Sequence, residues 1–385
     1  MNIVCAASVL GGSEAFSTLG RVLVLPEEDI RQEHVRNADV LVTRSKAQIN
    51  EELLHNTAVR FVGCAVAGQD HIDIPYLDQA GIAWSTAPGC NANSVAEYVI
   101  SAILIEAERL CLNLDRCTLG VVGVGHIGTR VAVLAEALGM TVLLNDPPRQ
   151  ALEAGRGIDF LELDDVLPMS DFITLHVPYT RTGPCPTHHL INGRFLEACS
   201  PESVLINMAR GEIMDSDAIL LALGHGALHK AVLDVWENEP AIRYDLLDFI
   251  DIATPHVAGY SQQGRLNGTY QVYEECCRFF ELDPIWDPES IQNEVQLPEC
   301  HIDATGRTSQ EVLTELIKLA SPLLQDDERL RAGASPEPDI MAAHFRACRR
   351  SYPERHEFNR YRITLEGASQ SLVDVASALG FVICG

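Results

Sequence analysis

The sequence predicts an α/β protein with parallel β-sheets covered by helices, and three observations support this class. Short apolar segments alternate with segments of helical periodicity along most of the chain. Three glycines at the G-x-G-x-x-G spacing, Gly123, Gly125 and Gly128, follow one such apolar segment, 119–122, and precede a helical one. The next apolar segment ends in an acidic residue, Asp146. This order of strand, glycine turn, helix, strand and acid is typical of a dinucleotide-binding Rossmann unit.

The first part of the chain, residues 1–93, is expected to form a flavodoxin-like domain. Its predicted strands are 2–5, 22–26, 39–43, 60–64 and 82–84, and its predicted helices include 49–56 and 75–80. Strands that alternate with helices in this way join into a parallel sheet. A further helix, 264–280, is expected to return to this domain, so residues 1–93 and about 264–286 together make the first predicted domain.

The glycine segment indicates how the second predicted domain, residues 94–263, binds a dinucleotide. Gly123 permits the tight turn, Gly125 lets a pyrophosphate approach the backbone, and Gly128 lets the helix pack against the strand. The N-terminus of that helix offers free N–H groups to the phosphates. Asp146 lies 18 residues after Gly128, where an acid can bond the ribose hydroxyls. Because this acid would repel a 2′-phosphate, we expect NAD rather than NADP.

Polar residues gather at the carboxyl ends of the later strands of this second domain. A long apolar helix, 94–108, is expected to lead into it. The later predicted strands are 172–176, 203–207, 230–234 and 250–253. Arg210, Glu239 and His256 follow three of these strands. Ligands of doubly wound sheets bind at such strand ends, so we expect the chemistry of the protein there.

These three residues suit acid–base chemistry on a carboxylate. The guanidinium of Arg210 can grip a carboxylate with two parallel hydrogen bonds. An imidazole such as that of His256 can take a hydroxyl proton, while Glu239 can bond its other ring nitrogen and fix the tautomer. Singly, each residue has an ordinary structural explanation, but together on one nucleotide-binding sheet they indicate a catalytic site. Among the other histidines, His188 and His189 have no carboxylate partner at metal-binding spacing and are expected to be surface residues.

The end of the chain, residues 287–385, is predicted to be a separate α+β domain. Asp-Pro pairs at Asp283 and Asp287 mark its boundary. Helices are expected over 309–324 and 339–350, and strands over 362–365 and 381–384. No catalytic group of residues stands out in it, so assembly or regulation suits it better than chemistry.

Composition excludes several classes of partner. The chain has 385 residues, with 28 basic and 54 acidic side chains and a formal net charge of −26, which argues against nucleic acid and anionic membranes. No apolar segment approaches the length of a membrane span, and no basic region precedes the first apolar segment, so a cytoplasmic protein is expected. The 12 cysteines form no C-x-x-C pair, so neither a disulfide framework nor a metal site is expected.

The pairs Arg210-Gly211, Glu239-Pro240 and Pro255-His256 resemble the pattern of the D-isomer-specific 2-hydroxyacid dehydrogenases. A narrower resemblance, to members that oxidise 4-phospho-D-erythronate during pyridoxal 5′-phosphate biosynthesis, covers nearly the whole chain and is weakest after residue 290. The segments that carry it are 87–92, 146–149, 233–237, 254–260 and 264–269. The resemblance implies an NAD-dependent oxidoreductase and a homodimer assembled through the C-terminal domain.

The resemblance also implies a role for each site residue. His256 is then the acid–base catalyst, Glu239 its partner and Arg210 the clamp on the substrate carboxylate. The expected cofactor-binding residues are Gly123, Gly125, His126, Ile127, Gly128, Asp146, Val177, Ala209, Asp234 and Gly259. The expected substrate-binding residues are Arg44, Ser45, Val66 and Tyr260, and the substrate is a small phosphorylated hydroxy acid.

The sequence departs from the family pattern in the loops around the substrate. The first strand is followed by residues 5–8, Cys-Ala-Ala-Ser, where the family has Asp-Glu-Asn, and Cys64, Val66 and Val177 stand where it has threonine. Two alternatives therefore stay open. One is an NAD-dependent dehydrogenase of another D-2-hydroxy acid, such as 3-phosphoglycerate. The other is a binding protein that senses NAD(H) on the same fold.

Overall fold

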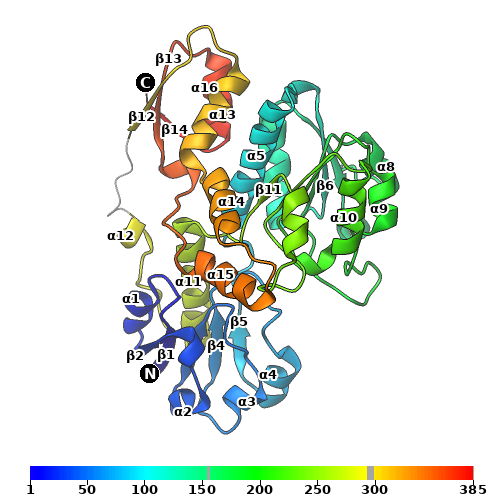
Figure 1. Ribbon diagram of the computed structural model, residues 1–385. Coiled ribbons are helices and arrows are strands. Elements are labelled where there is room, and N and C mark those ends of the chain that lie inside the picture. The colour runs from blue at the N-terminus through cyan, green and yellow to red at the C-terminus, as the bar shows by residue number, and fades with distance from the viewer. Residues whose placement is uncertain (154–156, 293–298, 385) are drawn as a thin grey trace. The chain divides into compact units, whose positions relative to one another are not determined.

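The computed structural model describes residues 1–153, 157–292 and 299–384, which form two compact units (Figure 1). Unit 1 comprises Met1–Ala92 and Tyr260–Gln296, and unit 2 comprises Asn93–Gly259 and Leu297–Gly385. Each unit contains parallel sheets and helices, which confirms the predicted α/β class. Residues 293–298 fall within the predicted C-terminal domain but lie outside the described residues.

Unit 1 is built on a five-stranded parallel sheet with the order β2-β1-β3-β4-β5, which is the flavodoxin-like order. Its strands are β1 (Asn2–Ala6), β2 (Arg21–Leu25), β3 (Val40–Thr43), β4 (Phe61–Cys64) and β5 (Ala83–Ser85). Its helices are α1 (Gly12–Ser17), α2 (Gln32–Val35), α3 (Glu51–Leu54), α4 (Ile74–Ala80), α11 (Gln262–Phe279) and α12 (Glu289–Gln292), with a 3-10 turn η1 at Glu27–Asp29.

Helix α11 returns to unit 1 and packs directly on β4. A Cβ built on Gly63 would lie 2.1 Å from Cγ1 of Val272, so the helix can approach the strand this closely only above a glycine. Tyr273, Cys276 and Cys277 on the same helix are buried in the core of unit 1. The helix expected to return to the first domain thus packs in the core of unit 1.

Unit 2 contains a six-stranded parallel sheet with the order β11-β10-β9-β8-β6-β7. Its strands are β6 (Thr118–Val122), β7 (Thr141–Asn145), β8 (Phe172–Leu175), β9 (Val204–Asn207), β10 (Lys230–Leu233) and β11 (Ile252–Ala253). The chain runs from β6 to β7 on one side and then crosses to β8 on the other, so the order reverses beside β6. A crevice at the carboxyl ends of strands around such a reversal is where doubly wound sheets bind nucleotides.

Helices and short turns surround this sheet. The helices are α5 (Ala92–Arg109), α6 (His126–Ala137), α7 (Pro147–Leu152), α8 (Leu163–Val166), α9 (Gly193–Ala198) and α10 (Ser216–Gly224). The 3-10 turns are η2 (Leu114–Arg116), η3 (Leu167–Met169), η4 (Gly211–Ile213) and η5 (Tyr244–Phe249). The strands are buried on both faces, as a parallel sheet covered by helices requires: Ile173 and Leu205 belong to an apolar core on one face, and Phe172 and Val204 are fully buried on the other.

The C-terminal section, which we define as the described residues 299–384, adds a three-stranded parallel sheet with the order β12-β13-β14. Its elements are β12 (Glu299–Asp303), α13 (Ser309–Ala320), α14 (Leu323–Ala332), α15 (Pro338–Arg350), η6 (Phe358–Arg360), β13 (Arg362–Glu366), α16 (Gln370–Ala378) and β14 (Val382–Cys384). The prediction of a single helix over 309–324 was wrong, because α13 ends at Ala320 and α14 begins at Leu323. Pro322 stands between them, and its ring fixes the backbone and removes an N–H donor.

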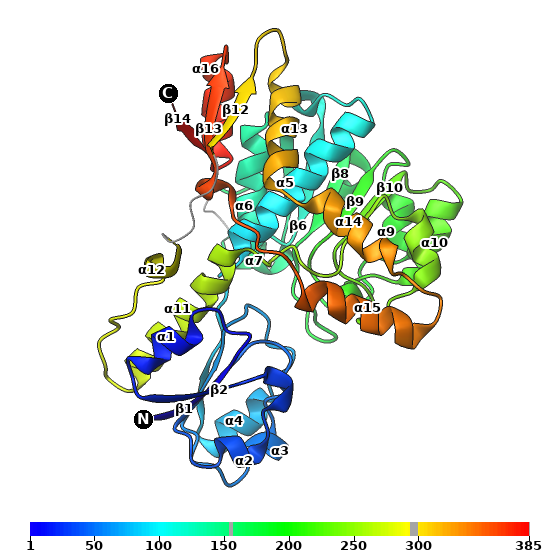
Figure 2. The same cartoon turned by 60° about the vertical axis from the view of Figure 1, so that its left-hand side comes forward.

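Helix α13 lies beside α5 in both ribbon views (Figure 2). The side chain of Gln310 joins the two parts: its Oε1 accepts from the N–H of Leu114 at 3.0 Å, and its Nε2 donates to the carbonyl oxygen of Leu112 at 2.8 Å. The C-terminal section is thereby hydrogen-bonded to the end of the α5 segment within unit 2.

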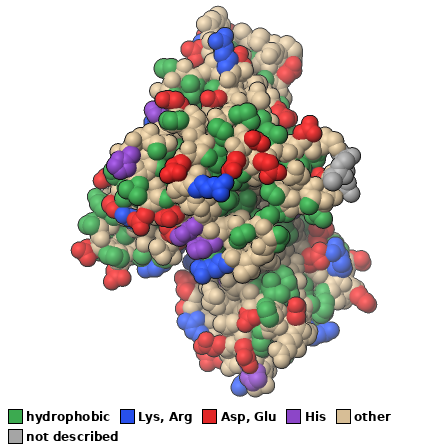
Figure 3. Space-filling model, turned by 90° about the vertical axis from the view of Figure 1, so that its right-hand side faces the viewer, with side chains coloured by type: hydrophobic (Ala, Val, Ile, Leu, Met, Phe, Trp, Pro, Cys, Tyr) green, Lys and Arg blue, Asp and Glu red, His purple; other side chains and the backbone are tan. Residues whose placement is uncertain are grey.

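The charged surface agrees with the composition. Acidic side chains are scattered over the face drawn in Figure 3 and do not gather in one patch. Among the described residues, no helix is long and apolar enough to cross a membrane, and no group of side chains suits a metal ion.

Candidate active site

The glycine turn between β6 and α6 has the geometry that a bound pyrophosphate requires. Gly123 has a φ of +89°, in the left-handed region that favours glycine. A Cβ on Gly128 would lie 2.0 Å from the carbonyl oxygen of Gly123, so α6 can pack this closely only through a glycine. A Cβ on Gly125 would meet no atom within 4 Å, and His126 beside it is exposed while Ile127 is half-buried. The turn therefore leaves the N-terminus of α6 open to an anionic group.

Asp146 lies beside this turn, at the end of β7. Its Oδ2 accepts from the N–H of Val124 at 2.8 Å, and its Oδ1 accepts from the N–H of Arg149 at 2.9 Å, which caps α7. Each carboxylate oxygen can accept a further hydrogen bond, and the residue is only half-buried. The turn and the acid thus fit the pyrophosphate and a ribose of a dinucleotide.

His256 and Glu239 form a hydrogen-bonded pair at the carboxyl edge of the six-stranded sheet. His256 follows β11, and Glu239 lies in the segment after β10. Nδ1 of His256 is 2.7 Å from Oε2 of Glu239, and Oε1 of Glu239 accepts from the N–H of Trp236 at 2.9 Å. The His256 side chain is 33% exposed. With Nδ1 held by a carboxylate, Nε2 is the ring nitrogen left for proton exchange with a ligand.

The backbone around His256 is held in an uncommon conformation. His256 has a φ of +57°, a value that non-glycine residues adopt only when their surroundings impose it. The fully buried carboxylate of Asp234 accepts from the N–H groups of Val257 and Ala258 at 2.8 and 2.9 Å and from the hydroxyl of Thr254 at 2.6 Å. Asp234 therefore fixes the turn that presents the histidine.

Arg210 lies at the next strand end, after β9. The side-chain amide of Asn207 accepts from the N–H of Ala209 and donates to the carbonyl oxygen of Arg210, both at 3.1 Å. A Cβ on Gly211 would lie only 1.9 Å from the carbonyl oxygen of Trp236. Glycine at this position therefore lets the Arg210 backbone lie against the segment that follows β10.

Arg349, on α15 of the C-terminal section, lies near the histidine pair and was missed by the sequence analysis. Its Nη1 is 3.9 Å from Oε2 of Glu239. Burial would raise the pKa of the Glu239 carboxyl, but His256, Arg349 and the Trp236 N–H together hold this pKa below its usual value. Glu239 is therefore an anion at neutral pH, as a partner of an imidazolium must be. No local sequence pattern connects Arg349 with residues so far away along the chain.

The end of β8 adds an uncharged wall beside the turn. Burial lowers the pKa of His176 to about 3, so its ring is neutral, and its Nε2 is 3.0 Å from the hydroxyl of Thr174. Val177 follows, and its Cγ1 would lie 2.7 Å from a Cβ on Gly123. Val177 thus packs against the glycine turn. Gly259, another expected cofactor residue, is the last residue of this part of unit 2.

His189 pairs with a carboxylate from a distant part of the chain, although it belongs to no group of side chains among the described residues that suits a metal ion. Its Nε2 lies 2.7 Å from Oε1 of Glu237, and Oε2 of Glu237 accepts from the N–H of Ser216 at 2.8 Å. His189 and Glu237 thus form a histidine–glutamate hydrogen bond comparable in length to that of His256 and Glu239. The pair of His256 differs in following β11 directly at the edge of the sheet.

The four expected substrate residues lie in unit 1, whereas the residues of the histidine site lie in unit 2. The guanidinium carbon of Arg44 is 5.2 Å from the ring centroid of Tyr260, a cation–π contact within unit 1. Ser45 is exposed, and Val66 is half-buried just after β4. Arg44 and Ser45 directly follow β3. Of the four expected substrate residues, the structure brings Arg44 and Tyr260 into contact.

Glu27, on η1, holds the segment after β3 and was also missed by the sequence analysis. It is only 2% exposed. Its Oε1 accepts from the N–H groups of Arg44, Lys46 and Ala47 at 3.1, 2.8 and 3.1 Å, and its Oε2 accepts from the hydroxyl of Ser8 at 2.5 Å. We call residues 44–47 the substrate loop. Three backbone N–H groups of this loop thus donate to the carboxylate of Glu27.

Comparisons with known proteins agree with this geometry. Residues 99–258 match the family model described as D-isomer specific 2-hydroxyacid dehydrogenase, NAD binding domain. Residues 295–380 match a domain of unknown function. Two curated relatives are both named erythronate-4-phosphate dehydrogenase. The one from Marinobacter nauticus is 39% identical over 95% of each chain, and the one from Proteus mirabilis is 38% identical over 99% of each chain.

Solved structures match a smaller part of the chain. A D-lactate dehydrogenase from Aquifex aeolicus, complexed with NAD and lactic acid, is 27% identical with a TM-score of 0.60, and the match covers 73% of this chain and 96% of that one. An NAD-dependent formate dehydrogenase from Staphylococcus aureus, in complex with NAD, is 23% identical with a TM-score of 0.60 over 75% of this chain and 98% of that one, which supports the fold alone.

Proposed function

The chain belongs to the erythronate-4-phosphate dehydrogenase family of NAD-dependent oxidoreductases, and we propose that it oxidises 4-phospho-D-erythronate to 3-hydroxy-2-oxo-4-phosphooxybutanoate. The observation that carries this proposal is the 2.7 Å pair of His256 and Glu239 on the edge of a sheet whose glycine turn fits NAD. In the same proposal, the product enters the biosynthesis of pyridoxal 5′-phosphate.

We propose that His256 is the acid–base catalyst. Its Nε2 takes the proton of the C2 hydroxyl, because Nδ1 is occupied by Glu239. Bound NAD supplies the acceptor for the hydride that leaves C2, so the products are the 2-oxo acid, NADH and one proton. As the ring becomes positively charged, the Glu239 carboxylate stabilises it. The fixed turn at His256 holds the ring in one orientation throughout.

We propose that two arginines bind the two anionic groups of the substrate. Arg210 is proposed to grip the carboxylate with its planar fork, which fixes the orientation of C2. Arg44, with Ser45 and Tyr260, is proposed to bind the phosphate. A chain with a net charge of −26 needs such local positive groups to hold an anion. The proposed cofactor contacts of Asp146, Val177, Ala209, Asp234 and Gly259 rest on their positions around the turn and strand ends.

A second candidate is a dehydrogenase of another D-2-hydroxy acid, such as 3-phosphoglycerate. The observation in its favour is the altered loop region: Val66 offers no hydroxyl, and the substrate loop donates its N–H groups to Glu27. The altered region affects substrate recognition and leaves the histidine pair intact.

The test is NADH formation, followed by absorbance, with 4-phospho-D-erythronate, 3-phosphoglycerate and unphosphorylated D-erythronate side by side. We expect 4-phospho-D-erythronate to give the highest kcat/KM. A preference for 3-phosphoglycerate would move the protein to the second candidate. Tight NADH binding without turnover of any of the three acids would contradict both and favour an NAD(H)-sensing protein.

We also propose three domains and a homodimer. Residues 1–93 with about 264–286 would form the substrate domain, 94–263 the NAD-binding domain, and 287–385 the dimerisation domain. Support comes from the parallel sheet β12-β13-β14, whose two outer strands each have one unpaired edge among the described strands. Light scattering of the full chain should give twice the mass of one chain, and a monomer at micromolar concentration would contradict this.

A further inference from the structure

We propose that the C-terminal section positions the catalytic histidine, with Asp327 and Arg355 acting as positioning residues that hold the backbone of residues 253–258, here called the His256 loop. The inference rests on the proposed role of His256. It extends that role to a section whose matched family model describes a domain of unknown function.

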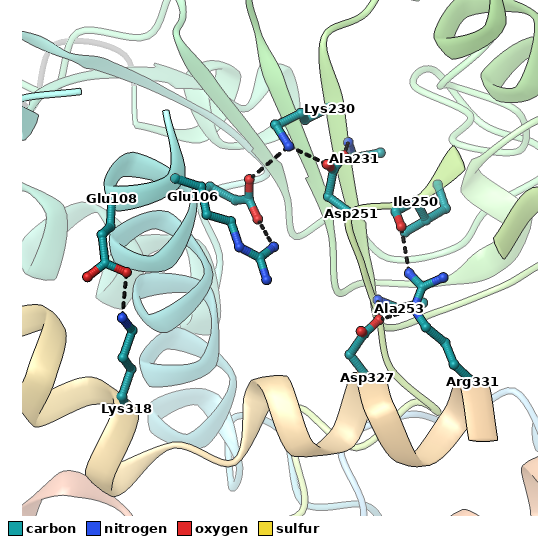
Figure 4. A network of polar contacts seen from close by, with 11 residues as sticks. Glu106, Glu108, Lys230, Ala231, Ile250, Asp251, Ala253, Lys318, Asp327 and Arg331 are labelled. Carbon is teal, nitrogen blue, oxygen red and sulfur yellow. Dashed lines mark hydrogen bonds and ion pairs between the residues drawn. The ribbon is translucent and has the colours of Figure 1, made fainter. Parts of the chain in front are cut away.

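Asp327 holds the beginning of the His256 loop. It lies on α14, and its Oδ1 accepts from the N–H of Ala253, the last residue of β11, at 2.7 Å (Figure 4). Strand β11 is an edge strand that pairs only with β10 in its sheet. A side chain of the C-terminal section therefore pairs with an N–H on the edge of the strand that leads into the histidine.

Arg331 keeps Asp327 in place. Its Nε is 2.8 Å from Oδ1 of Asp327, and its two terminal nitrogens donate to the carbonyl oxygens of Leu247 and Ile250 at 2.7 and 2.6 Å. Figure 4 shows Asp327 and Arg331 side by side on α14, both facing the segment of β11. The carboxylate of Asp327, which accepts from the Ala253 N–H, is thus fixed in position by Arg331.

Arg355 holds the end of the His256 loop. Its side chain is buried, with the residue 7% exposed, and its Nη2 donates to the carbonyl oxygen of Ala258 and to the hydroxyl of Ser94. The Ser94 hydroxyl also donates to the carbonyl oxygen of Ala258 at 2.9 Å. The Arg355 guanidinium stacks over the ring of Tyr98 at 4.8 Å. One buried cation of the C-terminal section therefore joins the end of the loop to the start of α5.

The two contacts complete a set that the NAD-binding sheet provides only in part. Within the sheet region, Asp234 accepts from the N–H groups of Val257 and Ala258. Asp327 adds the N–H of Ala253, and Arg355 adds the carbonyl oxygen of Ala258. A left-handed φ at a non-glycine residue persists only where several contacts determine it together. We assign part of that determination, at His256, to the C-terminal section.

The experiment compares Asp327→Ala with Lys318→Ala in the full-length protein. Lys318 on α13 pairs with Glu108 on α5, so it also joins the C-terminal section to the NAD-binding part, but it does not contact the His256 loop. We expect Asp327→Ala to lower kcat by about 10–100-fold, because small misplacements of a catalytic group have effects of this size. KM for the hydroxy acid, KM for NAD and the affinity for NADH should each change less than about threefold. Lys318→Ala should leave kcat unchanged.

Two further variants separate positioning from general damage. Asp327→Asn keeps an acceptor for the Ala253 N–H and should recover most of the lost kcat. Arg355→Lys keeps the buried charge but loses the fork, so we expect it to lower kcat with little change in KM. Thermal unfolding and light scattering of each variant show whether the fold and the assembly are retained.

Hydrogen exchange gives a readout that does not depend on turnover. In Asp327→Ala, the amide of Ala253 should exchange faster than in the unmodified protein, while Lys318→Ala should show no such change. The kinetic measurements use whichever hydroxy acid the unmodified protein oxidises best, so a failure of the substrate proposal is seen separately. Equal kcat for Asp327→Ala and Lys318→Ala, with unchanged exchange across residues 253–258, would overturn the inference.

Discussion

The histidine site of unit 2 and the substrate loop of unit 1 differ in whether their polar groups remain available to a ligand. At the histidine site, the polar groups of the protein leave a reactive atom available: Glu239 takes Nδ1 of His256, and Nε2 remains for a ligand. At the substrate loop, the backbone N–H donors are already bonded to another residue of the protein. Three backbone N–H groups that could bind a phosphate instead donate to Glu27.

This difference separates chemistry from selectivity. The residues expected to transfer the proton stand in the family pattern and are supported by buried contacts. The residues around the substrate loop depart from that pattern, and a buried carboxylate fills the position under the loop. A cradle of backbone N–H groups is a common anion site. Because Glu27 occupies it here, the proposed phosphate site depends on side chains such as Arg44.

The largest expected effect is at His256. His256→Ala should lower kcat by about 10²–10⁴-fold, since it removes the group proposed to take the hydroxyl proton, while NADH binding is retained. The matched control is His189→Ala, which breaks another histidine–glutamate hydrogen bond of the same length in unit 2, that with Glu237. Its kcat should stay within about threefold of the unmodified protein. If both variants lose activity equally, the 2.7 Å pair at His256 is not the distinguishing feature of the site.

An intermediate effect is expected at Glu27. Glu27→Ala leaves three N–H groups of the substrate loop without their acceptor, so the loop should lose its fixed shape. KM for the phosphorylated acid should rise about tenfold, equivalent to about 1.4 kcal/mol, with little change in the affinity for NADH.

Glu28→Ala is the control for this change. Glu28 pairs with Lys46 of the same loop at 3.7 Å, but both side chains are more than half exposed. Exposed pairs of this kind contribute about 0–1 kcal/mol, so KM should hardly change. A loss of thermal stability in Glu27→Ala without any rise in KM would show that the loop does not bind the substrate.

The sequence predicted those parts of the fold that depend on local patterns. Apolar strands and the turn at Gly123 have signals within a few residues, and both are confirmed. The break at Pro322 was missed because the apolar periodicity continues across it. Strand β12 was missed because its residues, Glu299–Asp303, alternate weakly and carry charge.

Long-range contacts explain what could not be predicted about the site. Glu27 begins a run of three acids that is typical of a solvated surface, yet it is buried under the substrate loop. Arg349 contacts Glu239, 110 positions earlier in the chain, and Asp327 contacts Ala253, 74 positions earlier. No sequence pattern connects the members of either pair. Such contacts are properties of the packed fold, so a single sequence gives no local sign of them.

The smallest expected effect is at Val66, and it is the most informative about the substrate. Val66 is half-buried, its N–H donates to the carbonyl oxygen of Cys64 at 2.7 Å, and its own carbonyl oxygen accepts from Ala87 at 2.9 Å. The backbone is therefore fixed whichever side chain is present. Val66→Thr replaces one methyl with a hydroxyl of similar size.

If 4-phospho-D-erythronate is the substrate, the added hydroxyl should find one of its oxygens and raise kcat/KM roughly fivefold, the equivalent of about 1 kcal/mol. The matched control is Val62→Thr on β4, where the side chain is fully buried and a hydroxyl should only reduce stability. An unchanged or lower kcat/KM in Val66→Thr would mean that the site has been reshaped for a different acid. The altered loop would then mark a change of substrate on an unchanged hydride-transfer site.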